Sequence, residues 1–233
     1  MIVNVAPGWS AVPVDDVGYF ESSELLQKTD EELKELIFRM RRVRYGGWRN
    51  HEGKWRDIMA LGTGGRVIWD YGCGTGMEAL ELARAGNQVR LWDAHRDNVR
   101  LARRVLIIHG FREYPGTGPF DTVHMSGVLH HIRRPQDVMR GNCRLLKPGG
   151  DVRLMLYSDQ GWRIATGTEP PDDVEQHPQF WQFVRFFDAV GDYADWYDAD
   201  RLEQRFGQWF TLERAEYMTP DRRYLGAVMR RRG

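Results

Sequence analysis

The chain has 233 residues, enough for one domain with a sizeable core, and its 42% hydrophobic and 28% charged residues are ordinary globular values. That composition excludes a disordered, collagen-like or fibrous chain. The formal net charge is zero, from 33 basic and 33 acidic residues, so the charge balance indicates no bulk attraction to nucleic acid or to a membrane surface.

Cysteine usage and the N-terminus bear on the compartment. Cys73 and Cys143 lie far apart in sequence and indicate neither a disulfide framework nor a zinc site. The first 16 residues, MIVNVAPGWSAVPVDD, lack the basic region and the long apolar run of a signal peptide. No stretch approaches the roughly 18 apolar residues of a membrane span. We therefore expect a cytoplasmic protein.

The N-terminal third is predicted to be helical after an irregular start over residues 1–20. Leu, Ile and Met recur at helical spacing over 22–43, and Gly46-Gly47 ends that pattern. The basic run 40–44 is expected to be the solvated end of this helix. A short second helix is expected over about 52–60.

From residue 66 onward, short apolar runs alternate with helical stretches. Strands are expected over 66–72, 88–93, 120–126 and 151–158, with at best a short one over 111–115, and helices over 77–86, 95–110 and 135–146. This spacing predicts a mostly parallel sheet with helices on both faces.

The C-terminal third departs from that rhythm. Residues 159–200 are dense in aromatics and are expected to form a helix or lid. A helix over 201–206 follows. The runs 209–218 and 222–231, which turn at Pro220-Asp221, predict a closing pair of strands.

The most informative stretch is VIWDYGCGTG at 67–76, which predicts a strand, a glycine loop and the start of a helix. Glycines allow a tight turn and the close approach of a ligand to the backbone. The spacing Asp-x-Gly-x-Gly-x-Gly differs from the dinucleotide pattern GxGxxG. The acid at the strand end, Asp70, suits a cationic or amine-bearing ligand.

A second acid follows 23 residues later, where Asp93 ends the next predicted strand. An acid at this place in a βαβ unit accepts hydrogen bonds from both ribose hydroxyls of a nucleoside ligand. Together, the glycine loop and the two acids predict a nucleoside site at adjacent strand ends.

These residues resemble the class I S-adenosylmethionine (SAM)-dependent methyltransferases. DYGCGTG is similar to the first motif of that family, and LWDAH at 91–95 to its acidic second motif. PFDTVHMSGVLHHI at 119–132 resembles the fourth-strand motif, and RLLKPGGDVRLMLY at 144–157 resembles the turn and fifth strand. The resemblance covers roughly residues 60–160.

The resemblance implies a Rossmann-like, doubly wound α/β fold with a seven-stranded, mostly parallel sheet and an antiparallel last strand. It implies SAM as the cofactor, over the carboxyl ends of the strands. The methionine part would be held by Asp70, Gly72, Gly74 and Gly76. The ribose would be held by Asp93, with Ala94 near the adenine and Ser126 beside the cofactor.

The sequence departs from the family pattern in two places. The region after the predicted third strand reads HGFREYPGTG, without the family's adenine-binding acid, and Phe111 or Arg112 is a candidate substitute. Some relatives bind a metal through acids at the positions of Gly127 and His130. We therefore expect no metal here.

Candidate catalytic residues follow the fourth-strand motif. If the acceptor is a hydroxyl or an ammonium, a group must take its proton, and a neutral imidazole suits that task. By position, His131 and His130 lie near the mouth of the site, with His131 slightly favoured. The alternative is that His131 only packs and hydrogen-bonds within the fold.

Acceptor selection is expected from outside the motif core. The whole chain, 1–233, is interpreted as one methyltransferase domain with an N-terminal helical cap over 1–60 and an aromatic-rich insertion or lid over 159–200. Those aromatics suit an apolar, aromatic or sugar acceptor, or alternatively core packing or a contact within a homodimer.

The preferred interpretation is methyl transfer to an O, N or C atom of a small-molecule acceptor. A tRNA or other nucleic-acid methyltransferase is an alternative if the arginine-rich stretches 39–44 and 222–232 form one face. A NAD-dependent oxidoreductase is a further alternative that the glycine spacing disfavours. A catalytically inactive, methyltransferase-like binding subunit is the last.

Overall fold

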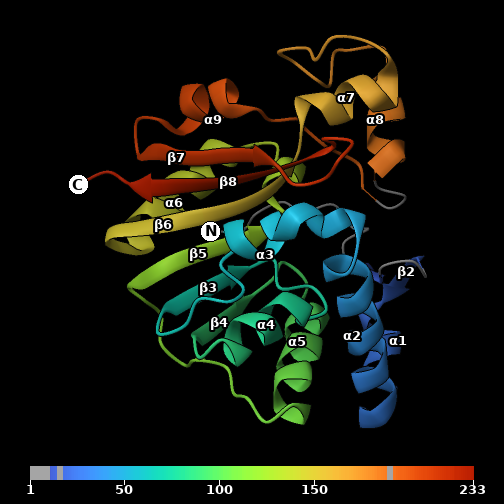
Figure 1. Cartoon of the computed structure of the whole chain (residues 1–233), viewed down its shortest axis with the longest axis vertical. Coiled ribbons are helices and arrows are strands. Elements are labelled where there is room, and N and C mark those ends of the chain that lie inside the picture. Colours follow the sequence, from blue (N-terminus) through green and yellow to red (C-terminus); the bar gives the residue numbers. More distant parts are fainter. Residues whose placement is uncertain (1–10, 15–17, 188–190) are drawn as a thin grey trace.

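The computed structural model describes residues 11–14, 18–187 and 191–233, so most of the N-terminal stretch expected to be irregular lies outside the described residues. Within them, six strands form the main sheet in the order β4-β3-β5-β6-β8-β7 (Figure 1). Their bounds are β3 Val67–Tyr71, β4 Gln88–Trp92, β5 Phe120–Ser126, β6 Leu146–Tyr157, β7 Phe210–Tyr217 and β8 Tyr224–Arg231. The other five strands of this sheet point in one direction, and β8 is antiparallel to both of its neighbours, β6 and β7. The doubly wound fold with one reversed strand is confirmed.

The expected seventh strand does not form among the described residues, because residues 111–115 run beside β4 without forming a ladder of backbone hydrogen bonds. One backbone hydrogen bond, from Tyr114 N–H to Val89 O at 2.8 Å, joins the two segments. The N–H of Leu91 is directed instead at the side-chain Oε1 of Glu113, at 3.4 Å. Pro115 has no N–H with which to continue the pairing.

Helices cover both faces of the sheet, each over its own hydrophobic cluster. One face carries α4, α5 and the N-terminal helices α2 and α3, packed on residues such as Ile68 and Leu91. The other carries α6 and α9, packed on residues such as Val123 and Leu154. The bounds are α2 Asp30–Tyr45, α3 Lys54–Ile58, α4 Met77–Arg84, α5 Arg96–Ile108, α6 Pro135–Leu145 and α9 Ala199–Phe206.

The N-terminal segment differs from the single long helix expected over 22–43. A hairpin of β1 (Ala11–Val14) and β2 (Gly18–Glu21) leads into the one-turn helix α1 (Ser22–Leu25). The helix α2 then starts separately, because Thr29 and Glu32 form a capping box. The Thr29 hydroxyl accepts from Glu32 N–H at 3.2 Å, and the Glu32 carboxylate accepts from Thr29 N–H at 2.7 Å.

The basic run at the end of α2 is not simply solvated, which corrects the expectation for residues 40–44. Arg41 contacts the buried Glu81 of α4 at 2.6 Å, and Arg44 lies 3.4 Å from the buried Glu78 of the same helix. Arg56 of α3 also binds Glu81, at 2.7 Å. Charged pairs therefore join the N-terminal helices to α4.

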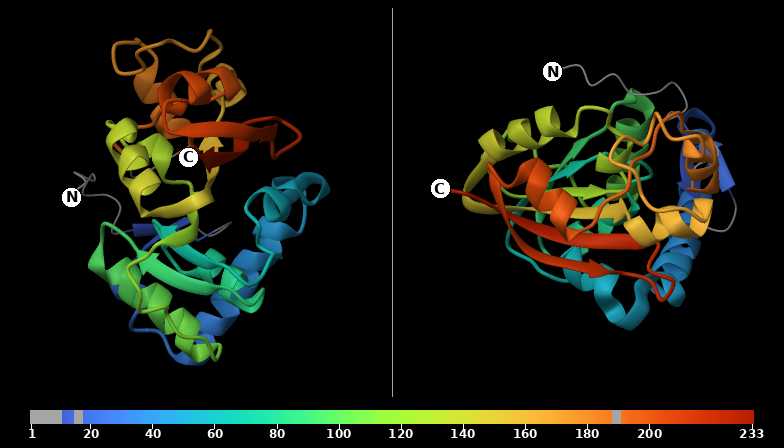
Figure 2. Two further views of the ribbon diagram at one scale, coloured as in Figure 1. Left: turned by 90° about the vertical axis from the view of Figure 1, so that its left-hand side faces the viewer. Right: turned by 90° about the horizontal axis from the view of Figure 1, so that it is seen from above.

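Buried side chains from the end of β6 and from the described residues of 159–187 and 191–196 form a third hydrophobic cluster. It contains α7 (Asp159–Thr166) and α8 (Phe180–Phe187), with Trp162 and Phe183 at its centre. Figure 1 shows α7 and α8 at the upper right and α2 at the lower right, on the side where β6 ends and α7 begins; Figure 2 gives two further views. The pair of helices α7 and α8 and the N-terminal helix α2 therefore lie towards the carboxyl ends of the parallel strands.

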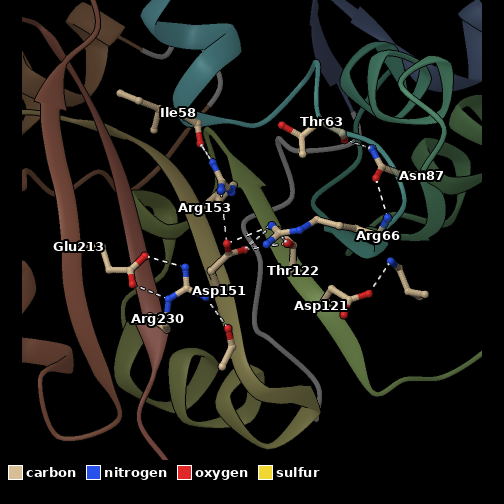
Figure 3. A network of polar contacts seen from close by, with 12 residues as sticks. Ile58, Thr63, Arg66, Asn87, Asp121, Thr122, Asp151, Arg153, Glu213 and Arg230 are labelled. Atoms are coloured by element: carbon tan, nitrogen blue, oxygen red, sulfur yellow. Dashed lines mark hydrogen bonds and ion pairs between the residues drawn. The ribbon is translucent and has the colours of Figure 1, made fainter.

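The opposite, amino end of the sheet is held by the polar network in Figure 3. Asp151 of β6 is 0% exposed and accepts hydrogen bonds from Thr122 at 2.7 Å, from Arg66 at 3.0 Å and from Arg153 at 3.3 Å. These contacts join β5 and β6 to the residue that precedes β3. A buried carboxylate of this kind is stable only because each neighbour is a donor.

Across the described ranges, no helix is long and apolar enough to cross a bilayer.

Candidate functional site

The glycine loop between β3 and α4 contains three glycines with positive φ: Gly72 at +86°, Gly74 at +47° and Gly76 at +80°. A Cβ on Gly76 would lie 2.6 Å from the Cα of Ala102 on α5, so only glycine allows α4 and α5 to pack this closely. A Cβ on Gly74 would meet nothing nearer than Val12 of the N-terminal hairpin, at 3.8 Å. The backbone at Gly74 is therefore approachable.

Asp93 is bound to this loop from the end of the neighbouring strand. Its Oδ2 accepts the Gly74 N–H at 3.0 Å, and its Oδ1 accepts from His95 N–H at 3.0 Å and from the Asn98 amide at 2.9 Å. The Ser22 hydroxyl donates to Asn98 Oδ1 at 2.6 Å, which links α1 to this carboxylate. Burial raises the pKa of Asp93, although these donors oppose the shift.

Asp70, the acid at the end of β3, is 3% exposed and lies beside the register partner His124 of β5. The imidazole Nδ1 donates to Asp70 Oδ1 at 2.9 Å. The second oxygen, Oδ2, is buried and has no hydrogen-bond partner among the residues that the structure describes. An unsatisfied buried carboxylate oxygen is costly, which favours a ligand donor at this position.

Two further predicted residues lie at strand ends in the same region. Ser126 is the last residue of β5, and its buried hydroxyl likewise has no hydrogen-bond partner in the described part of the chain. Ala94 is exposed and directly follows Asp93. All seven predicted binding residues lie at or after the carboxyl ends of β3, β4 and β5. Because these strands are adjacent and parallel, the residues share one edge of the sheet.

The two histidines after β5 have different environments. His130 is 0% exposed, and its Nδ1 accepts the Tyr157 N–H at 3.3 Å, so the neutral ring carries its proton on Nε2. Burial and the neighbouring His131 lower the pKa of His130 well below the usual value. His131 is half-buried, and its Nδ1 donates to Tyr193 O at 2.9 Å, which leaves the lone pair on Nε2.

The expected acceptor-binding aromatics divide between core and surface. Most aromatics of the insertion, such as Trp162 and Phe183, are buried and pack the fold. Phe187 stacks on Tyr157 at 4.0 Å, beside the histidine pair. Trp181 and Phe186 of the insertion are exposed, as is Trp48 of the N-terminal cap.

The sequence interpretation missed several residues that complete this region. They are His124, Glu78, Asn98, Ser22, Val12 and Tyr193. Most of them reach the site from more than 50 positions away in the chain, where no local pattern marks them. The exceptions are Asn98, five residues after Asp93, and Glu78, two residues after Gly76, which lie close to predicted site residues in the sequence.

Metal ligation has no candidate among the residues described: no group of three or more His, Cys, Asp or Glu side chains is arranged to hold an ion.

Comparison with known proteins agrees with this geometry. The model of the methyltransferase domain family matches residues 42–218, well over half of the chain. The chain therefore belongs to this methyltransferase family, and it has the fold of class I SAM-dependent methyltransferases.

Individual relatives are more distant. The chain is 38% identical over 114 residues to the cypemycin N-terminal methyltransferase of a Streptomyces species, a match that covers 44% of this chain and 46% of the relative. It is 29% identical over 160 residues to the ubiquinone biosynthesis O-methyltransferase of Escherichia coli (strain IAI39), covering 63% of this chain and 66% of the relative. The matches thus span less than two thirds of either relative's length.

Among solved structures, a SAM-dependent methyltransferase from Mesorhizobium loti has the same fold. The TM-score is 0.57 at 18% identity, over 76% of this chain and 97% of the other.

The site residues fit SAM as the cofactor. The unsatisfied Asp70 Oδ2 suits its ammonium group, and Asp93 suits its ribose hydroxyls. Around Gly74, the open backbone leaves room for a ligand that a side chain would fill.

Proposed function

We propose that the chain transfers the methyl group of SAM to a nitrogen or oxygen atom of a small-molecule acceptor. The proposed cofactor-binding residues are Asp70, Gly72, Gly74, Gly76, Asp93, Ala94 and Ser126. The observation that carries this proposal is the pairing of Gly74 with Asp93 beside the unsatisfied Oδ2 of Asp70. When bound, SAM supplies a methyl group that its sulfonium has already made electrophilic.

The protein's own task is then to orient the acceptor, exclude water and take a proton. His131 is the proposed base, because the Tyr193 carbonyl accepts a hydrogen bond from the proton on Nδ1 and the basic lone pair of the ring is therefore on Nε2. His130 is proposed to position it, since the two rings lie 4.1 Å apart and His130 stacks on Tyr157 at 3.8 Å.

The acceptor is proposed to bind between the N-terminal cap, residues 1–60, and the insertion over 159–200. The stack of Phe187 on Tyr157 offers an aromatic surface next to the histidines. The names of the relatives, an N-terminal methyltransferase and an O-methyltransferase, support an amine or a hydroxyl as the accepting group. A homodimer contact through the exposed Trp181 remains a prediction.

A nucleic-acid acceptor is less well supported, because many arginines in the two basic stretches bind the protein itself. Arg41 and Arg44 pair with α4, Arg223 pairs with Asp221, and Arg230 pairs with Glu213. Their charge is thus partly neutralised before any phosphate could approach.

The test is release of S-adenosylhomocysteine (SAH) in the presence of panels of small amines, phenols and short peptides, with tRNA as a separate arm. With an acceptor found, His131→Gln is expected to lower kcat by about 10²- to 10⁴-fold and to leave SAH affinity unchanged. His109→Gln is the matched control, because His109 also hydrogen-bonds a backbone carbonyl through Nδ1, but outside the site. Turnover with tRNA alone, or wild-type kcat in His131→Gln, contradicts the proposal.

A further inference from the structure

The buried side chain of His124 lies next to the proposed cofactor site and contacts two carboxylates, those of Asp70 and Glu78. His124 and Asp70 are register partners on β5 and β3, and their side chains are only 1% and 4% exposed. Both side chains point to the α4 face of the sheet. There, His124 Nε2 lies 3.4 Å from Glu78 Oε2.

The second carboxylate is itself anchored to the N-terminal helices. Glu78 Oε1 accepts from the Trp55 indole at 2.9 Å and lies 3.4 Å from the Arg44 guanidinium. The groups joined by these contacts, two carboxylates, one imidazolium and one guanidinium, sum to zero charge, and the guanidinium of Arg153 on β6 also acts on His124. Such a balance is what a buried ionic cluster requires.

The protonation of the two central groups is coupled. Burial lowers the pKa of His124, but the hydrogen bond and charge of Asp70, together with the charge of Glu78, outweigh it and raise that pKa above its ordinary value. Burial raises the pKa of Asp70, whereas the hydrogen bond and charge of His124 oppose the rise. The histidine cation therefore favours the ionised form of the aspartate.

We infer that His124 is a positioning residue for cofactor binding: held between Asp70 and Glu78, its imidazolium keeps Asp70 ionised and leaves Oδ2 available to the ammonium group of SAM. This inference rests on the proposed cofactor site. It goes further by assigning a role to a side chain that does not itself contact the cofactor.

The pH dependence has a definite sign. Ammonium binding needs the Asp70 carboxylate, so affinity falls as the pH drops through the pKa of Asp70. Without the His124 cation the pKa of Asp70 rises, so the affinity begins to fall at a higher pH. The charged groups that face His124 are Asp70 from β3, Glu78 from α4 and Arg153 from β6.

The experiment is calorimetry with two ligands on wild type and His124→Gln, between about pH 5 and pH 7.5. SAH carries the amino-acid group, whereas 5′-methylthioadenosine lacks it. The Kd of 5′-methylthioadenosine divided by the Kd of SAH thus isolates the Asp70 contribution from any titration of Asp93. We expect His124→Gln to lower this ratio at least about tenfold, the equivalent of one pKa unit. The decline of the ratio at acid pH should also begin at higher pH in the variant. His109→Gln should behave as wild type.

Outcomes separate this inference from the proposed function. Wild type that binds neither ligand refutes the cofactor site itself. If both ligands bind, and if the ratio and its decline at acid pH are the same in wild type and in folded His124→Gln, only the role of His124 is refuted.

A measurement on wild type covers the case in which the variant does not fold. The imidazole ¹⁵N resonances of His124 should move when SAH binds and stay in place with 5′-methylthioadenosine. Equal shifts with both ligands, or no shift with SAH, would overturn the inference.

Discussion

The backbone N–H of Gly74 donates a 3.0 Å hydrogen bond to Oδ2 of Asp93, which ties the glycine loop after β3 to the carboxyl end of β4. Two strands that are adjacent in the sheet thereby present one continuous polar surface. At Gly74 the backbone of this loop is in a conformation that only glycine adopts easily, with φ at +47°.

Gly74→Ala should separate ligand binding from folding. The new Cβ would have no neighbour closer than 3.8 Å, so we expect only the strain of a positive φ, about 1–2 kcal/mol. It would, however, occupy the space expected for the cofactor, so SAH affinity should be largely lost, and Gly74→Val should abolish it.

Gly86→Ala is the control for this change. Gly86 has φ at +91° and open space around its Cβ position, but it lies at the other end of α4. Denaturant titration should give both variants similar stabilities, while calorimetry shows SAH binding only in the control. Unimpaired binding by Gly74→Ala would place the cofactor elsewhere.

Gly76→Ala should instead destabilise the fold. Its Cβ would lie 2.6 Å from the Cα and 3.1 Å from the carbonyl oxygen of Ala102, backbone atoms that cannot move without shifting α5. Strain and overpacking together predict a loss of roughly 2–5 kcal/mol in the free energy of unfolding. The same denaturant titration checks this, and a loss no greater than that of Gly86→Ala would contradict the packing described.

Asp151→Asn should be the most damaging change at the amino end of the sheet. The substitution leaves Arg66 and Arg153 without their shared buried carboxylate, and removing one partner of a buried ion pair costs about 3–5 kcal/mol. Because both arginines are partly exposed, the lower end of that range is expected. At about 2–4 °C per kcal/mol, thermal melting should resolve the loss easily.

The control is Asp137→Asn, which breaks the exposed pair with Arg140 on α6. Such helix-surface pairs contribute about 0.3–0.5 kcal/mol. Similar melting temperatures for the two variants would show that Asp151 is not the anchor that its contacts indicate.

Much of the fold follows from local sequence patterns. The strand predicted over 120–126 has those same bounds as β5, because its apolar run is flanked by clear breaks. The closing strand pair was also predicted correctly, as β7 and β8. Where a side chain competes with the backbone ladder, as Glu113 does at Leu91, periodicity misleads, and a predicted seventh strand is lost.

Contacts between distant segments could not be predicted in this way. The sequence identifies Asp70 and Asp93 through their spacing from the glycines, but not that His124, 54 positions from Asp70, would share its hydrogen bond. Likewise, a basic helix end is normally solvated, and only the packed structure brings Arg44 to Glu78. The glycine loop was predictable because its chemistry is local, whereas its charge balance depends on tertiary packing.

Asp93 gives the most direct test of the cofactor site. Calorimetry should compare SAH binding by wild type and by Asp93→Ala, with NADH as a second ligand. Wild type is expected to bind SAH and not NADH. Asp93→Ala is expected to bind SAH at least about a hundredfold more weakly, since two charged hydrogen bonds of about 1.5–3 kcal/mol each are lost. Wild-type affinity for SAH in a folded Asp93→Ala protein, or binding of NADH in place of SAH, would contradict it.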